Sequence, residues 1–139
     1  MSDKMSVESL QALIDGSSFL RFIGLKVVSI DPAAAMVVLR VALRPELERR
    51  DGTGQWHGGP IAALIDSAGD YAVALGLGNV VPTINFRVDY LRPAMTAELT
   101  ATARVRRAGR TVAIVDIDVS DAEDRLVAIG RACYSSQPG

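Results

Sequence analysis

The sequence predicts a single α+β domain, in which a curved antiparallel sheet of about six strands surrounds one buried helix. The chain has 139 residues, which suits one domain, residues 1–139, with a substantial core. A central stretch, residues 56–78, is apolar on nearly every side of the helix it would form, as expected for a helix enclosed by other protein. Segments rich in Val, Ile and Leu lie on both sides of this stretch and predict the strands.

Composition and charge narrow the classes of function. Hydrophobic residues make up 49% of the chain, charged residues 22%, and the net charge is -1, which fits a globular domain without a nucleic-acid surface. One cysteine excludes an intramolecular disulfide, and one histidine argues against a multi-ligand zinc site, so no metal is expected. Residues 1–16 are too polar for a secretory signal, and no uninterrupted apolar run is long enough to span a membrane. We therefore expect a cytoplasmic protein with a small-molecule partner and no membrane or nucleic-acid partner.

The N-terminal part predicts a short helix followed by a hairpin. Ser6 is a suitable N-cap and Gly16 a suitable stop for the helix, whose apolar residues recur at helical spacing. Asp31-Pro32-Ala33 is a turn signal between two strand-like segments. The expected elements are a helix over 7–14 within a leading segment 1–18, a turn over 19–23, strands over 25–30 and 35–43, and a polar loop over 46–54.

The C-terminal part predicts four strands. They are expected over 81–90, 97–106, 111–120 and 126–134, followed by a tail over 135–139. The connections between them are short enough for an antiparallel meander. A single helix leaves an edge and part of a face of such a sheet uncovered, and pairing of two copies would cover them. We therefore expect at least a homodimer.

The central stretch contains an anomaly. His57-Gly58-Gly59-Pro60 predicts a loop that turns into a helix start, and the helix can continue to about Leu75. Its only charges are Asp66 and Asp70, which lie one turn apart on one side. Burying a carboxylate costs several kcal/mol unless it is paired or hydrogen-bonded. No Lys or Arg lies between residues 56 and 78 to pair with them.

These residues and the order of the elements resemble the hotdog-fold thioesterases of the phenylacetate-degradation (PaaI-like) branch. The resemblance covers residues 19–134. It rests on His57-Gly58-Gly59 followed by Leu64-Ile65-Asp66, then on Tyr90-Leu91-Arg92-Pro93-Ala94 and Gly109-Arg110. It implies hydrolysis of acyl-coenzyme A thioesters at a site shared between the two subunits of a dimer, and such dimers often pair into tetramers. Coenzyme A enters as part of the substrate, so no other cofactor is expected.

The residues at the helix start suit the thioester hydrolysis that the resemblance implies. A thioester carbonyl at a helix N-terminus meets free backbone N–H groups and the positive end of the dipole, which stabilise a developing oxyanion. Gly58 and Gly59 have no side chain to block this approach. Asp66 would then act either as a nucleophile or as a general base for water, and the sequence does not separate these routes. The structural alternative for Asp66 is a buried acid that hydrogen-bonds a neighbouring segment.

Further candidates follow from the resemblance, each with a structural alternative. His57 would orient the loop or touch the thioester. Asp51 stands where related proteins often carry an Asn that orients water or substrate, and it is otherwise a turn acid. Thr83 matches a Ser or Thr that holds the attacking water, although Thr is also common in strands. Asp70 stands where the family usually has a small or hydroxyl residue, so it is either a binding residue or an acid at the dimer seam.

The remaining candidates concern the rest of the substrate. The coenzyme's phosphates need cations, and Arg92, Arg107 and Arg110 lie at or beside turns, where solvated loop charge is the alternative. Trp56 would line the acyl pocket or simply pack in the core. Two other functions stay open: a hotdog protein that binds acyl-CoA without hydrolysing it, and a hotdog hydratase or dehydratase.

Overall fold

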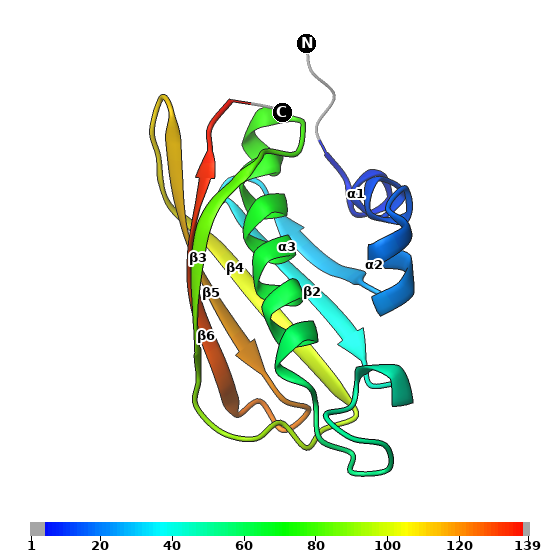
Figure 1. Ribbon diagram of the computed structural model, residues 1–139. Helices are drawn as coiled ribbons and strands as arrows, with labels where there is room; N and C mark the ends of the chain where they lie inside the picture. The colour runs from blue at the N-terminus through cyan, green and yellow to red at the C-terminus, as the bar shows by residue number, and fades with distance from the viewer. Residues whose placement is uncertain (1–4, 138–139) are drawn as a thin grey trace.

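The computed structural model describes residues 5–137, so the extreme ends of the predicted leading segment and tail lie outside the described residues. The helices and strands follow the predicted order (Figure 1). They are α1 (Val7–Asp15), α2 (Ser18–Ile23), β1 (Lys26–Asp31), β2 (Met36–Ala42), the 3-10 helix η1 (Pro45–Leu47), α3 (Gly58–Leu77), β3 (Thr83–Tyr90), β4 (Glu98–Ala108), β5 (Val112–Ser120) and β6 (Leu126–Ser135).

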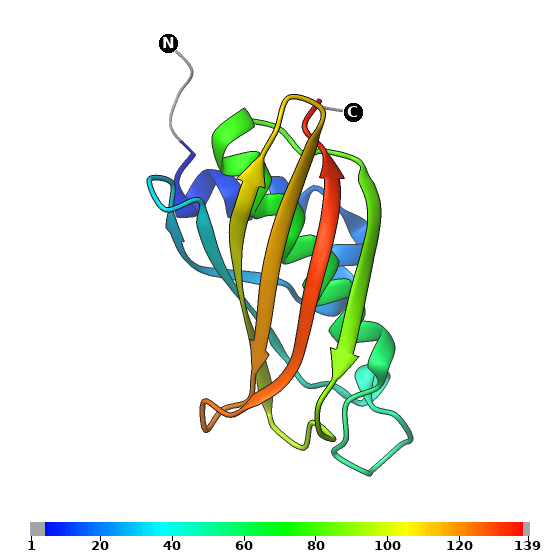
Figure 2. The ribbon, with the colours of Figure 1, turned by 90° about the vertical axis from the view of Figure 1, so that its left-hand side faces the viewer.

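The sheet is antiparallel, in the order β1-β2-β4-β5-β6-β3. The prediction of a continuous meander is therefore wrong for β3, which pairs with β6 at the far edge instead of with β4 (Figure 2). Residues 91–97, between β3 and β4, carry the chain past the ends of β6 and β5. A connection of this length reaches across two strands, each ~4.8 Å wide, so length alone does not distinguish the crossover from a hairpin.

The predicted buried helix is confirmed as α3, which lies in the concave face of the sheet (Figure 1). Its length and composition would also suit a membrane span, but the core helix of a soluble protein passes the same test. Two glycines allow the helix and sheet to approach closely. A Cβ at Gly130 would lie 2.6 Å from the Cγ2 of Ile65, and one at Gly69 would overlap the Tyr134 ring. The phenol of Tyr134 donates a 2.7 Å hydrogen bond to the carbonyl of Asp66.

Two local predictions need correction. Residues 19–23 were expected to form a turn, but they lie in α2, which Ser17 caps at its start and Gly24, at φ 78°, ends. The helix α3 begins at Gly58, because the His57 side chain caps it, and it continues to Leu77. The predicted loop His57-Gly58-Gly59-Pro60 is therefore mostly the first turn of the helix itself.

The two edges of the sheet differ. The side chain of Gln11 in α1 donates to the carbonyl of Leu25 at 3.1 Å and accepts from the N–H of Val27 at 2.7 Å, so it covers the start of β1 as a strand would. The edge strand β3 instead leaves large apolar side chains exposed, among them Ile84 and Phe86. The structure thus protects the β1 edge and leaves the β3 edge open.

Candidate active site

The first turn of α3 offers the N–H of Gly58 as a backbone donor. The N–H of Gly59 is taken by the Nδ1 of His57 at 3.2 Å, and Pro60 has no N–H. The N–H of Gly58 has no hydrogen-bond partner within residues 5–137. The positive end of the helix dipole adds to its attraction for an anion. Of the two predicted glycines, Gly58 therefore offers the donor and Gly59 completes the cap with His57.

Tyr90 fixes this turn from the other side. Its hydroxyl donates a 2.7 Å hydrogen bond to the carbonyl of Gly58. The same ring restricts position 58, because a Cβ there would lie 3.2 Å from the tyrosine oxygen. Tyr90 is not among the site residues predicted from the sequence, although it begins the Tyr90-Leu91-Arg92 motif. A tyrosine at the end of a strand has high strand propensity in any case, so the signal was weak.

Asp66 lies two turns along the helix and is half-buried. Its Oδ1 accepts a 2.8 Å hydrogen bond from the hydroxyl of Thr83, the first residue of β3. No ion pair of this carboxylate occurs in the described part of the chain. The structure thus brings together Asp66 and Thr83, both predicted site residues, and does not neutralise the acid with an arginine.

Asp70 lies one turn beyond Asp66, on the same side of α3. Its Oδ1 accepts a 3.0 Å hydrogen bond from the N–H of Val81, in the connection that leads to β3. Burial raises the pKa of Asp70 to about 6, with a smaller contribution from the charge of Asp66, while the hydrogen bond from Val81 opposes the rise. Asp70 therefore changes charge close to neutral pH.

A cavity of about 410 Å³ opens beside the first turn of α3. Trp56 forms one wall and is nearly fully buried, with its indole N–H donating to the carbonyl of Thr96 at 2.8 Å. Two arginines, Arg49 and Arg92, line the same cavity. Arg49 was missed by the sequence analysis because it lies in a charged loop with no distinguishing motif. Trp56 thus packs in the core and lines a cavity at once.

The other predicted cations lie elsewhere. Arg107 is exposed at the end of β4, and Arg110 lies in the β4–β5 turn. Arg110 lines a separate, mainly apolar cavity of about 320 Å³ beside the C-terminal end of α3. The β4–β5 turn and the segment after β3, which carries Arg92, lie at opposite ends of the molecule (Figure 2). One chain therefore does not bring the three predicted arginines together.

Asp51 lies in the loop that precedes α3. It is exposed and has no hydrogen-bond partner within residues 5–137. The neighbouring turn is held by another acid, since the N–H of Gly52 donates to the Oε2 of Glu48 at 2.7 Å. Asp51 is therefore not needed to hold this loop, and its carboxylate is free to face outward.

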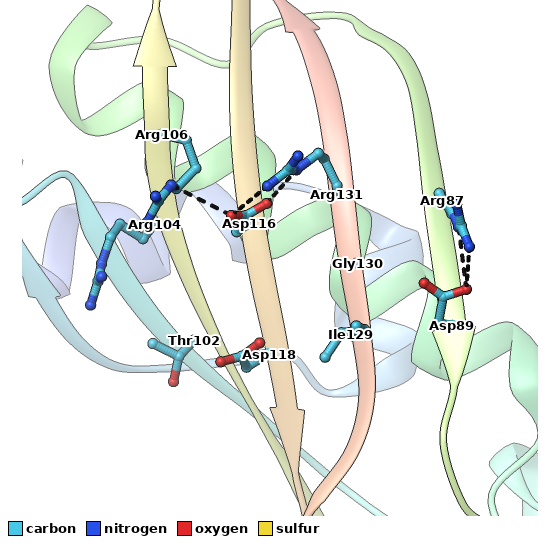
Figure 3. A pocket seen from close by; sticks show the side chains of 10 residues that line it. All are labelled: Arg87, Asp89, Thr102, Arg104, Arg106, Asp116, Asp118, Ile129, Gly130 and Arg131. Atoms are coloured by element: carbon cyan, nitrogen blue, oxygen red, sulfur yellow. Dashed lines mark hydrogen bonds and ion pairs between the residues drawn. The ribbon is translucent and has the colours of Figure 1, made fainter.

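Another cavity, of about 540 Å³, lies on the outer face of the sheet, away from α3 (Figure 3). Its charges largely pair with one another. Asp116 accepts from Arg131 at 2.7 Å and lies 3.5 Å from the Nε of Arg106, and these arginines lower its pKa. A carboxylate held in this way is a poor base, so the size of this cavity does not make it the reactive site.

Comparisons with known proteins identify the family of this chain. The family model for the Thioesterase superfamily matches residues 53–128. A Halobacterium salinarum protein that is provisionally named an esterase is 37% identical over 136 residues, which cover 90% of this chain and 88% of that protein. The acyl-coenzyme A thioesterase PaaI of Escherichia coli is 29% identical over 126 residues, covering 89% of this chain and 86% of PaaI.

Solved structures give the same result. A crystal structure from the thioesterase superfamily superposes with a TM-score of 0.86 and 37% identity, covering 93% of this chain and 96% of that one. The structure of E. coli PaaI, from the phenylacetic acid degradation operon, superposes with a TM-score of 0.82 and 25% identity, covering 95% and 93%. The predicted resemblance is thereby confirmed. The chain belongs to the thioesterase superfamily, within which it is a hotdog-fold thioesterase of the PaaI-like branch.

Proposed function

We propose that this protein is an acyl-CoA thioesterase, in which Asp66 promotes attack on the thioester and the N–H of Gly58 stabilises the oxyanion. The observation that carries the proposal is an acid without a cationic partner in the described chain, held by the hydroxyl of Thr83, on the helix whose first turn leaves one N–H free. The match to PaaI, named an acyl-coenzyme A thioesterase, supports the substrate class.

The proposed reaction hydrolyses the thioester to a free acid and coenzyme A. With Asp66 as general base, its carboxylate takes a proton from water while the water oxygen bonds to the carbonyl carbon. The carbonyl oxygen becomes an oxyanion that the Gly58 N–H stabilises. The carbon–sulfur bond then breaks, and coenzyme A leaves as a thiolate that takes up the proton. With Asp66 as nucleophile, its carboxylate bonds to the carbonyl carbon, the carbon–sulfur bond breaks and coenzyme A leaves, and water then cleaves the mixed anhydride to the free acid and the Asp66 carboxylate. Both routes use the same two groups, and neither requires a cofactor besides the substrate's own coenzyme A.

These two groups come from different copies of the chain in our proposal. Gly58 and Asp66 are separated by eight helical positions, or ~12 Å at 1.5 Å per residue, so one carbonyl cannot touch both in a single chain. Antiparallel pairing of two β3 edges about a two-fold axis sets the two α3 helices in opposite directions. This brings the first turn of one α3 toward the middle of the partner's α3. The exposed Ile84 and the protected β1 edge favour the β3 edge for this homodimer.

The outer face of the sheet supports a further pairing of dimers into a homotetramer. Strand register places two neighbouring rows of side chains across it, one being Arg104, Asp116, Arg131 and Arg87, and the other Thr102, Asp118, Ile129 and Asp89. The first row is net positive and the second net negative. A two-fold axis running between the rows would set the positive row of one sheet against the negative row of another.

The decisive experiment measures thiol release from a panel of aromatic and aliphatic acyl-CoA substrates. The native chain is compared with Asp66→Asn and Asp66→Ala, and Asp124→Asn in the exposed β5–β6 turn serves as the matched control. We expect kcat to fall by about 100-fold or more in both Asp66 variants, as for loss of a catalytic base or nucleophile, and to be retained in the control. Turnover that survives in Asp66→Ala would overturn the proposal.

Two alternatives give different results in the same assay. Binding of acyl-CoA by the native chain without thiol release would indicate a binding protein. Consumption of an enoyl or hydroxyacyl substrate without thiol release would indicate a hydratase or dehydratase. The half-buried Asp66 favours hydrolysis over simple binding, because a binding protein has no need for a carboxylate without a cationic partner at this position.

A further inference from the structure

We propose that Asp70 is a positioning residue, which ties the start of β3 to α3 and so holds the hydroxyl of Thr83 against Asp66. The inference rests on the proposed function. It gives Asp70, which the sequence leaves as either a binding residue or an acid at the dimer seam, a role in placing Thr83.

The tie consists of two hydrogen bonds between the same two elements. The Oδ1 of Asp70 accepts from the N–H of Val81 at 3.0 Å, and two residues later the hydroxyl of Thr83 donates to the Oδ1 of Asp66 at 2.8 Å. Asp66 and Asp70 are one turn apart on α3, so the two hydrogen bonds lie side by side between the helix and the segment that enters β3. The hydrogen bond of Asp70 holds the chain at Val81, just before Thr83 makes its hydrogen bond to Asp66.

Within residues 5–137, no other hydrogen bond of the segment before Thr83 joins it to the side of α3. The carbonyl of Pro82 accepts from the N–H of Ser135 at 2.9 Å, which fixes the start of β3 to β6, not to α3. The pairing of β3 with β6 is also irregular between Thr83 and Asn85, so strand pairing does not by itself fix the position of Thr83 along α3. Before Val81 the helix ends at Gly78, whose φ is 76°, and the chain turns away. Asp70 thus accepts the hydrogen bond that holds the segment at Val81 against the face of α3.

The carboxylate is also costly where it stands. It is half-buried, it lies one turn from a second acid, and no cation pairs with it in the described part of the chain. A small residue would avoid that cost. Its side chain reaches a backbone donor that a serine at the same position is too short to reach. The contribution of the carboxylate is therefore its hydrogen bond with the N–H of Val81.

The test compares Asp70→Ser, whose side chain is shorter, with Asp70→Asn, whose amide oxygen can still accept from the N–H of Val81. We expect Asp70→Ser to lower kcat about tenfold with little change in KM, because Thr83 and Asp66 lose their mutual position while substrate contacts remain. Asp70→Asn should retain kcat within about twofold. Equal loss in both variants, or full activity in Asp70→Ser, would overturn the inference.

A double-mutant cycle separates positioning from general destabilisation. Thr83→Val removes the hydroxyl through which Asp70 acts, so adding Asp70→Ser to Thr83→Val should lower kcat by less than about twofold. A full additional tenfold loss would show that Asp70 acts by another route. As a matched control, Asp121→Ala removes a carboxylate that accepts the N–H groups of Glu123 and Arg125 in the β5–β6 turn, and it should lower the melting temperature without changing kcat.

Failure of the proposed function gives a different pattern from failure of this inference. Full turnover by Asp66→Ala overturns both. Loss of turnover by Asp66→Ala together with full turnover by Asp70→Ser overturns this inference alone. Loss in both, with rescue by Asp70→Asn, supports both.

Discussion

The hydroxyl of Tyr90 donates a 2.7 Å hydrogen bond to the carbonyl of Gly58, which joins the end of β3 to the first turn of α3. Thr83, at the beginning of the same strand, donates to Asp66 in the middle of the helix. The two ends of one strand therefore hold the two parts of the proposed catalytic machinery. The strand that carries the open edge of the sheet is also the strand that orients the site.

Removal of the Tyr90 hydroxyl tests this connection. Tyr90→Phe leaves the carbonyl of Gly58 without its donor, so the first turn of α3 becomes less well placed for the oxyanion. We expect kcat to fall about three- to tenfold, with a loss of about 1 kcal/mol in the free energy of unfolding. Steady-state thiol release and denaturant unfolding measure the two effects. An unchanged kcat would show that this hydrogen bond has no part in positioning Gly58.

A methyl group at position 58 should act through the same tyrosine. In Gly58→Ala the new Cβ would lie 3.2 Å from the Tyr90 oxygen, which is tighter than an ordinary contact, so the ring or the turn must shift. We expect kcat to fall about tenfold or more, and Tyr90→Phe in the same chain to restore part of it by removing the oxygen. Gly76→Ala is the control, because a Cβ there meets nothing within 4 Å and kcat should not change. No recovery in the double variant would contradict this explanation.

The sequence predicted the helices better than the contacts between elements. The apolar character of residues 56–78 identified α3, and Ser6 and Gly16 identified α1, because these signals are local. The pairing of β3 with β6 is non-local, and the connection over residues 91–97 fits a hairpin as well as a crossover. The sequence alone left this pairing undetermined.

In the candidate site, too, the sequence predicted the residues better than the contacts between them. Asp66 and the glycines were identified from residue type and spacing. The contact between Asp66 and Thr83 depends on how the chain returns from the helix to the edge strand, which no local pattern reports. The distinction between Gly58 and Gly59 depends on the orientation of the His57 ring, which takes one N–H and leaves the other. Both features depend on the three-dimensional structure, and the sequence motif alone does not reveal them.

The pKa of Asp70 gives a pH-dependent prediction for stability. Its value in the folded protein is about 6, against an ordinary value of 3.8, so the folded state favours the protonated form. The contribution of this group to stability is fully present below pH ~4 and is lost as the pH rises to ~6. Asp70→Asn should therefore raise the free energy of unfolding by roughly 1 kcal/mol at pH 8, after allowance for solvent screening, and should give no gain near pH 4. Thermal melts of both proteins across this range measure the difference; an equal gain at both pH values would contradict the assignment.

The open edge of β3 predicts which substitution would disrupt the proposed homodimer. Ile84 is 53% exposed on this strand, and Ile84→Asp would place a carboxylate against its symmetry mate in a β3–β3 interface. We expect loss of the dimer in light scattering and loss of thiol release together. Val28→Asp makes the same change at an exposed residue of β1, the protected edge, and should leave both unchanged. A dimer that persists in Ile84→Asp would place the interface elsewhere.

Mixing two inactive variants tests whether the site is shared between copies. If one copy supplies Asp66 and its partner supplies Gly58, a mixed dimer of Asp66→Ala and Gly58→Val chains contains one site with both residues intact and one with neither. Random exchange makes about half of the dimers mixed, and half of their sites work, so about a quarter of native turnover should return. If Gly58 and Asp66 acted within one chain, every site in the mixed dimer would carry a substitution and no turnover would return. Co-expressed chains with two different affinity tags, purified in sequence, allow the mixed dimer to be measured alone. Its expected turnover is about half that of the native dimer, because exactly one of its sites is complete in a two-fold symmetric assembly.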